Sequence, residues 1–191
     1  MRSVYSLAQE KGIHVHLDGA RLWNAAQAKG IKESEYAKYA DSVMSCFSKG
    51  LGAPIGSILA GPEDFIEDAR GIRKVLGGGM RQVGYIAAAA LYALENHRER
   101  LTEDHRRARR IAEEFAGIKA LKVDLDTIET NIIFVEVLPP YSAIKWVKFL
   151  KENDVLAIPV SKDTVRFVTH LQIDDKDVEK LLLLTHKYFK T

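Results

Sequence analysis

Apolar positions along the first half of the chain follow two different periods. β-Branched residues alternate over 13–18, and apolar runs occupy 41–48 and 54–61, which predicts three short strands, the second one buried. Around these runs, apolar residues recur every three to four positions, which predicts helices. The expected helices span residues 3–10, 20–28, 63–76 and 82–96, the last one Ala-rich and well buried. Strands that alternate with helices are typical of an α/β domain with a mainly parallel sheet.

The pattern changes after residue 98. A long charged helix is expected over 99–117, and short strands then alternate with two further helices. The expected strands are 121–125, 130–137, 156–160 and 164–169, and the expected helices are 141–153 and 175–189. The last helix places on one face Val178, Leu181, Leu182, Thr185 and Tyr188. We therefore predict two domains, 1–98 and 99–191, of which the second is small, α+β and mostly antiparallel.

Charge and composition narrow the class of protein. Among 191 residues, 28 Lys and Arg oppose 26 Asp and Glu, so the net charge of +2 argues against a general nucleic-acid binder. The densest basic run, HRRARR at 105–110, lies in a helical pattern whose other face is apolar. That face consists of Ala108, Ile111, Ala112 and Phe115. A solvated helix face is favoured over a nucleic-acid patch.

The single cysteine and the absence of long apolar runs bear on location. Cys46 excludes a disulfide within the chain and lies in an apolar run, which favours a core position over a nucleophile. No secretion signal and no apolar run of about 18 residues are visible. We expect a soluble cytoplasmic protein without a membrane partner.

One stretch, SCFSKGLGAPIGS at 45–57, surrounds a lysine with small residues. Lys49 follows an apolar strand, and the glycines after it allow the backbone to approach a bulky ligand while leaving the side chain a cavity. The glycine spacing fits neither a dinucleotide fingerprint nor a Walker loop. A desolvated lysine has a lowered pKa and can form a Schiff base with a carbonyl.

A carboxylate lies at the end of the preceding strand, in HLDGAR. Asp18 can face a ligand there, because ligands of open α/β sheets bind at the carboxyl ends of strands. Alternatively, Asp18 caps the helix that begins near Ala20. Pyridoxal phosphate requires a lysine for its aldehyde and a carboxylate for its pyridine nitrogen, so Asp18 and Lys49 form a pair of the right kind.

Two further features are weaker when taken alone. GGGMRQ at 77–82 is either an anion-binding turn or a break between helices. Arg166 lies within an apolar strand, where a substrate carboxylate or a local acid, Asp163 or Asp174, would be its partner. The histidines show no metal-ligand spacing, and His14 and His16 are expected to be partly buried.

Four separated segments together resemble the low-specificity L-threonine aldolases. The segments are HLDGARLWNAA, DSVMSCFSKGLGAPIGS, LGGGMRQ and VRFVTH. The resemblance runs over essentially the whole chain. It implies the aspartate aminotransferase-like fold of fold-type I pyridoxal-phosphate enzymes, and cleavage of L-threonine or L-allo-threonine into glycine and acetaldehyde. It also implies a homodimer or homotetramer.

The resemblance assigns roles to individual residues. Lys49 would be the Schiff-base lysine, and Asp18 would bind the pyridine nitrogen. Arg21 and Arg166 would hold the substrate carboxylate, and Arg21 would also belong to the cofactor-binding residues. Arg81 and Lys74 would lie near the cofactor phosphate, across the dimer interface.

The chain departs from the family pattern in one large feature, and other functions stay open. Family members carry a longer N-terminal part with a phosphate-binding turn and a histidine that stacks on the cofactor, so this chain is expected to correspond to part of the large domain, 1–98, plus the small domain. The alternatives are another fold-type I activity, such as an aminotransferase or a cysteine desulfurase-like lyase, and a non-catalytic fragment that is inactive on its own.

Overall fold

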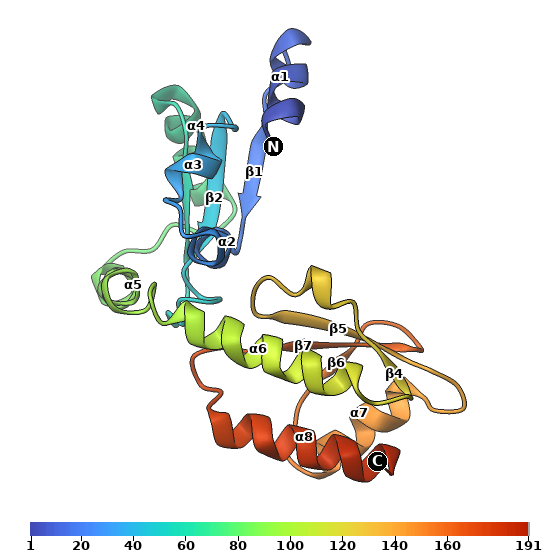
Figure 1. Ribbon diagram of the computed structural model, residues 1–191. Coiled ribbons are helices and arrows are strands. Elements are labelled where there is room, and N and C mark those ends of the chain that lie inside the picture. The colour runs from blue at the N-terminus through green and yellow to red at the C-terminus, as the bar shows by residue number, and fades with distance from the viewer. Residues whose placement is uncertain (191) are drawn as a thin grey trace. The chain divides into compact units, whose positions relative to one another are not determined.

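The computed structural model describes residues 1–190 (Figure 1). The chain divides into two compact units, Met1–Arg100 and Leu101–Thr191. Each unit contains its own sheet and its own helices.

The first unit is built on a three-stranded sheet. Its strands are β1 (His16–Gly19), β2 (Ser42–Cys46) and β3 (Ser57–Ala60), in the order β1-β2-β3. β1 and β2 are parallel, whereas β2 and β3 are antiparallel. The expected parallel arrangement therefore holds for β1 and β2 and not for β3, because β3 returns directly from the short loop after β2.

Five helices accompany this sheet among the described residues. They are α1 (Arg2–Glu10), α2 (Leu22–Lys29), α3 (Ser34–Ala37), α4 (Glu63–Val75) and α5 (Gly84–Asn96). Four of them match expected helices, and the short α3 was not expected. Gly30 ends α2 with φ of 63°, and its backbone N–H donates to the carbonyl of Ala26. This left-handed conformation favours glycine, which explains why the helix ends there.

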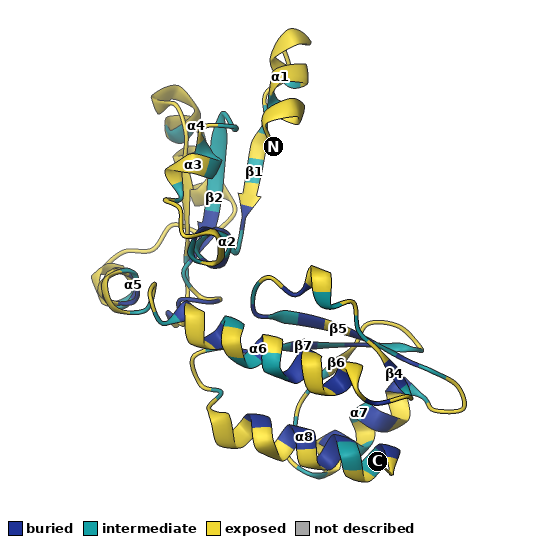
Figure 2. Ribbon diagram, in the orientation of Figure 1, coloured by how far each residue is buried: buried dark blue, intermediate teal, exposed yellow. Residues whose placement is uncertain are grey.

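Burial in the first unit is sparse. The expectation that α5 is well buried is wrong, because only Ala90 and Ala93 of this helix are buried and Tyr85 is 92% exposed. Every residue of β3 is exposed, and β2 is fully buried only at Ser45 and Cys46. Figure 2 shows the exposed residues over α1 and α4. Cys46 has the predicted core position.

The second unit is an antiparallel α+β unit, as predicted. Its elements are α6 (Leu101–Ala116), β4 (Leu121–Lys122), η1 (Leu125–Thr127), β5 (Ile132–Val137), α7 (Ala143–Glu152), β6 (Ile158–Pro159), β7 (Thr164–Val168) and α8 (Asp175–Phe189). The strand order is β4-β5-β7-β6, and all three ladders are antiparallel.

The second unit contains a well-packed core around Trp146. This fully buried indole lies 5.6 Å from Phe115, 5.3 Å from Phe167 and 5.2 Å from Phe189, measured between ring centroids. Side chains alternate along β5 and β7, so that Val135, Phe167 and their neighbours on one face join the helices in this core. The opposite face of the sheet is thereby left for other contacts.

The basic run on α6 is a solvated helix face, as the sequence favoured. Ala108, Ile111, Ala112 and Phe115 are buried, as predicted. The arginines pair with acids instead: Arg106 with Asp175 at 2.8 Å, Arg109 with Glu113 at 2.6 Å, and Arg110 with Glu179.

Candidate active site

Asp18 and Lys49 lie at the same edge of the first unit's sheet. Asp18 is next to the last residue of β1 and is in register with Met44 of the parallel strand β2. Lys49 follows β2, whose last residue is Cys46. Because parallel strands end at the same edge of a sheet, a ligand there can reach both side chains. Both side chains are exposed.

The backbone around Lys49 is fixed by a closed loop, residues 47–56. Phe47 closes the loop, since its N–H donates to the carbonyl of Gly56 at 3.0 Å and its own carbonyl accepts from the N–H of Ala53 at 3.0 Å. Inside the loop, the N–H of Gly52 donates to the carbonyl of Lys49 at 3.0 Å, and Leu51 is fully buried. Gly52 and Gly56 have φ of 69° and 116°, a region that favours glycine.

The side chain of Lys49 is available for a ligand. Within residues 1–190 its amine makes no hydrogen bond and no ion pair, and it is exposed. The sequence predicted a lysine in a cleared cavity. The residues of this chain leave the space around Lys49 open but do not enclose it. Lys49 is therefore held at its backbone and free at its amine.

Asp18 is not the cap of the following helix. α2 begins at Leu22 with Arg21 as its N-cap residue, and no side chain caps it. One carboxylate oxygen of Asp18 instead accepts from the N–H of Ala20 at 3.1 Å, which forms a local turn. Arg21 is half-buried where this turn meets the helix. The second carboxylate oxygen of Asp18 makes no hydrogen bond within residues 1–190 and is left for another partner.

Residues that the sequence analysis did not single out brace the Lys49 loop. The indole N–H of Trp23 donates to the carbonyl of Cys46 at 3.1 Å, and its ring stacks on Phe47 with centroids 6.3 Å apart. Nδ1 of His97 lies 2.7 Å from the carbonyl oxygen of Leu51. A lone Trp and a lone His in helical patterns gave no signal of this role, because their partners are 23 and 46 residues away.

Arg81 and Lys74 flank the glycine turn after α4. Lys74 lies in the last turn of α4, and Arg81 lies in the irregular segment before α5. Both are exposed, and neither side chain forms an ion pair within the part of the chain described. Gly77 has φ of 77°, and the N–H of Gly78 donates to the carbonyl of Arg73 at 2.8 Å. The segment is thus a helix break that carries two free cations.

Arg166 belongs to the second unit and lies in the middle of β7. Its Nε is buried without a hydrogen-bond partner, and the side chain forms no ion pair with any of residues 1–190. Both local acids are engaged elsewhere. Asp163 bonds to Ser161 and Thr164, whereas Asp174 caps α8 by accepting from the N–H groups of Lys176 and Asp177. The local-acid alternative is therefore wrong in this structure.

The surroundings of Arg166 are apolar. Phe134 of β5 and Ile158 of β6 are its register partners, and they are 52% and 51% exposed. The Nε atom of Arg166 is thus a buried donor without a partner, in a side chain that is half-buried as a whole, and such an unsatisfied donor costs free energy.

The histidines of the first strand are more exposed than expected. His14 lies before β1 with its side chain 93% exposed, and its Nδ1 is 3.9 Å from a carboxylate oxygen of Asp41. His16 is also exposed and pairs with the hydroxyl of Ser42 at 2.8 Å. The described residues contain no group of three or more His, Cys, Asp or Glu that could hold a metal. None of the described helices combines the length and hydrophobicity that crossing a membrane requires.

Comparison with known proteins gives the chain close relatives. It is 43% identical over 181 residues to low-specificity L-threonine aldolase 1 of Arabidopsis thaliana. The aligned residues cover 94% of this chain and 51% of the relative. It is 39% identical over 185 residues to the low specificity L-threonine aldolase of Escherichia coli K12, with 95% of this chain and 53% of the relative covered. The chain thus spans about half the length of these relatives.

Solved structures show the same fold. The threonine aldolase of Leishmania major matches with a TM-score of 0.76 at 18% identity. The match covers 97% of this chain and 55% of the aldolase chain. The ornithine δ-aminotransferase of Plasmodium falciparum matches with a TM-score of 0.66 at 17% identity. The match covers 100% of this chain and 50% of the aminotransferase chain. The predicted aspartate aminotransferase-like fold is therefore confirmed. The family model described as beta-eliminating lyase matches residues 1–138, and the chain therefore belongs to the beta-eliminating lyase family.

Proposed function

We propose that this chain provides part of a pyridoxal-phosphate-dependent lyase that cleaves the Cα–Cβ bond of L-threonine or L-allo-threonine, giving glycine and acetaldehyde. The observation that carries the proposal is the pair Asp18 and Lys49, exposed at the ends of two neighbouring parallel strands. The threonine aldolase names of the relatives support the choice of substrate.

The residues present fit the cofactor. Pyridoxal phosphate, when bound, supplies an aldehyde that captures an amine and a ring that accepts the electron pair of the broken bond. Lys49 would hold the aldehyde carbon covalently between turnovers through its unpartnered amine. Asp18 would keep the pyridine nitrogen protonated through its second carboxylate oxygen, which is an electrostatic role of the kind that contributes most to catalysis. Arg81 and Lys74 would contribute positive charge toward the phosphate.

The substrate carboxylate would be held by arginines. Arg166 supplies a buried guanidinium donor that lacks a protein partner. Two parallel N–H···O bonds to a carboxylate would satisfy it and fix the orientation of the substrate. Arg21, at the start of α2, would be the second carboxylate ligand. Such a clamp prevents rotation about the Cα bonds and so selects which bond breaks.

We further propose a division of the chain into domains and an assembly of the whole protein. Residues 1–98 would form part of the cofactor-binding large domain, and residues 99–191 would form the linker helix and the small domain. We expect the whole protein to act as a homodimer or homotetramer, with Arg81 serving a cofactor across the dimer interface. Sedimentation of the full-length protein tests the oligomeric state, and the affinity of the Arg81→Ala variant for pyridoxal phosphate tests the role of Arg81.

The first experiment is an absorbance scan of the purified chain with added pyridoxal phosphate, followed by borohydride reduction and peptide mapping. We expect a visible band and a cofactor label trapped on Lys49. The Lys49→Ala variant should lose both, while Lys32→Ala, an exposed lysine outside the site, should keep both. A label scattered over surface lysines would contradict the proposal for this chain and favour an inactive fragment.

A second measurement identifies the reaction. Release of acetaldehyde from threonine by the full-length protein is the expected result. Transfer of the amino group from alanine to a keto acid, or release of sulfur from cysteine, would instead identify an aminotransferase or a desulfurase-like lyase that uses the same lysine and aspartate.

A further inference from the structure

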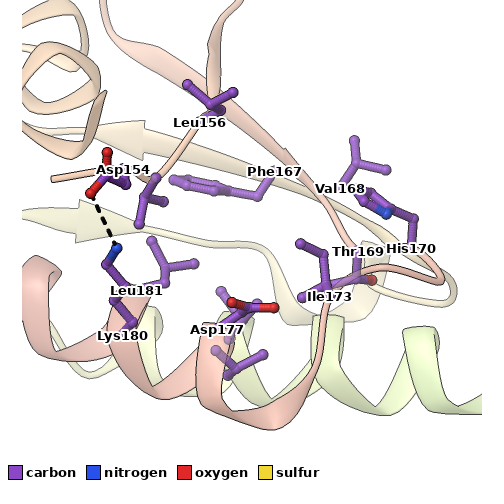
Figure 3. A pocket seen from close by; sticks show the side chains of 13 residues that line it. Asp154, Leu156, Phe167, Val168, Thr169, His170, Ile173, Asp177, Lys180 and Leu181 are labelled. Atoms are coloured by element: carbon purple, nitrogen blue, oxygen red, sulfur yellow. Dashed lines mark ion pairs between the residues drawn. The ribbon is translucent and has the colours of Figure 1, made fainter. Parts of the chain in front are cut away.

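The second unit contains a cavity that the proposed reaction does not use. It has a volume of about 320 Å³ and lies between α8, the end of β7 and residues 154–156 (Figure 3). The apolar residues that line it are Ile111, Val155, Leu156, Phe167, Val168, Ile173, Val178 and Leu181. Small-molecule sites have volumes of roughly 300–1,000 Å³, so this cavity suits a ligand at the small end of that range.

Arg166 is not among the residues that line the cavity, although the two residues that follow it on β7, Phe167 and Val168, are. Phe167 is a buried member of the core on the helix side, and it lines the cavity. Arg166 precedes it along β7, and successive side chains of a strand point to opposite faces. The cavity is therefore lined by neighbours of the group that we assign to the substrate carboxylate and not by that group itself.

Charged groups of both signs border the cavity. Asp177 and Lys180 are three residues apart on α8 and so lie on the same helix face. Nζ of Lys180 is 3.9 Å from Oδ2 of Asp154, with side-chain exposures of 47% and 95%. Figure 3 shows this pair on one side of Phe167, with Asp177 nearer the centre. A pair this long and this exposed contributes little to stability, so both partners can turn to a ligand.

Asp177 has an unused acceptor. Its Oδ2 accepts from the backbone N–H of Asp174 at 3.0 Å, as part of the capping box of α8. Its other carboxylate oxygen has no hydrogen bond or ion pair within the described residues. Two carboxylates and one ammonium thus surround an apolar wall, and the matching ligand carries an ammonium, a carboxylate and an apolar body.

We propose that this cavity reversibly binds a free α-amino acid with an apolar side chain. The ligand's ammonium would donate to Asp177, and its carboxylate would accept from Lys180. Its side chain would contact Phe167, Val155 and Leu181. An α-amino acid bears its ammonium and its carboxylate on the same carbon. The two groups are therefore close enough together to reach Asp177 and Lys180, which lie on the same face of α8. The site is independent of the proposed reaction and would make the second unit a sensor of amino acids.

The test uses L-leucine as the probe and methyl resonances of the full chain as the readout. Leucine should shift, in a saturable way, the methyl signals of Ile173, Val155 and Leu181, which line the cavity. Val4 of α1 should not respond. 4-Methylpentanoate, which lacks the ammonium, should bind at least about tenfold more weakly, as loss of one charge-assisted contact predicts. L-Alanine keeps both charges but lacks the apolar body, and it should also bind at least about tenfold more weakly because less apolar surface is buried.

Variants separate this site from the substrate site. Lys180→Gln and Asp177→Asn should each weaken leucine binding about tenfold, and the asparagine retains the acceptor that the capping box needs. Lys176→Gln is the matched control, because it removes the same charge from α8 outside the cavity. Arg166→Lys should leave leucine binding unchanged. The proposal is overturned if no cavity methyl shifts at about 50 mM leucine. It is also overturned if Lys176→Gln and Lys180→Gln weaken binding equally.

Discussion

The indole N–H of Trp23 donates to the carbonyl oxygen of Cys46 at 3.1 Å, at the residue where β2 ends and the Lys49 loop begins. The same ring stacks on Phe47, and the guanidinium of Arg98 lies 5.7 Å above it. Arg98 is held in turn by both carboxylate oxygens of Glu33, at 2.6 and 2.7 Å. A helix side chain thus sets the position from which Lys49 projects.

Trp23→Phe should loosen the Lys49 loop while retaining most of the stacking on Phe47. The carbonyl of Cys46 loses its indole donor, which costs about 1 kcal/mol of unfolding free energy. Amide hydrogen exchange at Ala53 and Gly52 should accelerate by a factor of about five, since 1.4 kcal/mol is tenfold. Exchange at Leu150, in the core of the second unit, serves as the internal reference. Unchanged exchange at Ala53 would show that the brace does not restrain the loop.

Gly19→Ala should displace β1 from β2. A Cβ built on Gly19 would lie 2.6 Å from the carbonyl oxygen of Met44, a backbone atom of the neighbouring strand. Overpacking of this kind costs about 1–3 kcal/mol, and it would move Asp18 as well. Gly71→Ala, in the middle of α4 with nothing within 4 Å, is the matched control and should be neutral or stabilising. Urea denaturation of the two variants compares them, and equal midpoints would contradict the prediction.

Arg166→Ala in the full-length protein should weaken threonine binding far more than cofactor binding. Loss of a bidentate guanidinium contact raises the dissociation constant of the amino acid by at least about tenfold. The affinity for pyridoxal phosphate, measured by absorbance, should change little. Arg109→Ala, an α6 arginine paired with Glu113, is the control for lost positive charge. Equal losses of both affinities would mean that Arg166 is a structural residue.

His105 should make the chain less stable in mild acid. Burial lowers the pKa of His105 below its ordinary value of 6.5, although the charge of Asp104 opposes this shift. The folded chain therefore binds this proton less readily than the unfolded chain. Stability is fully present above pH 6.5 and is lost as the pH falls from 6.5 toward the lowered value.

The His105→Gln variant isolates this contribution. The difference in unfolding free energy between the two proteins, measured in urea at several pH values, should change between pH 7 and 5. His14→Gln is the matched control, because it makes the same substitution at a histidine whose side chain is 93% exposed. A difference that is constant with pH would refute the role of His105.

Much of the secondary structure could be predicted from the sequence, because local signals determine it. Gly30 ends α2 and Asp174 starts α8, and both act through bonds to residues within four positions. The start of β1 was placed three residues early for a different reason. The N–H of Val15 donates to the side chain of Asp41 at 2.7 Å, so an apolar alternating segment pairs with a carboxylate instead of a strand.

Some residues of the candidate site could likewise be predicted from local sequence, and others could not. The sequence indicated ligand-binding roles for Asp18, Lys49 and Arg166. Each is a charged residue at the end of an expected strand or inside one, and this position is visible in the sequence. The brace of Trp23 and His97 could not be predicted, since it depends on contacts across 23 and 46 residues that no local pattern reports. The exposure of α5 was also missed, because hydrophobic composition does not say whether a covering element is present.

The apolar core of the second unit has a thermodynamic consequence. Its extended buried cluster, from Ala108 to Phe189, has no counterpart of similar size among the described residues of Met1–Arg100. Chains with more than one domain commonly depart from a single two-state transition. Calorimetry of the chain should therefore record two transitions, and heating should turn the chain into a folded C-terminal domain carrying an unfolded N-terminal tail before the second transition begins.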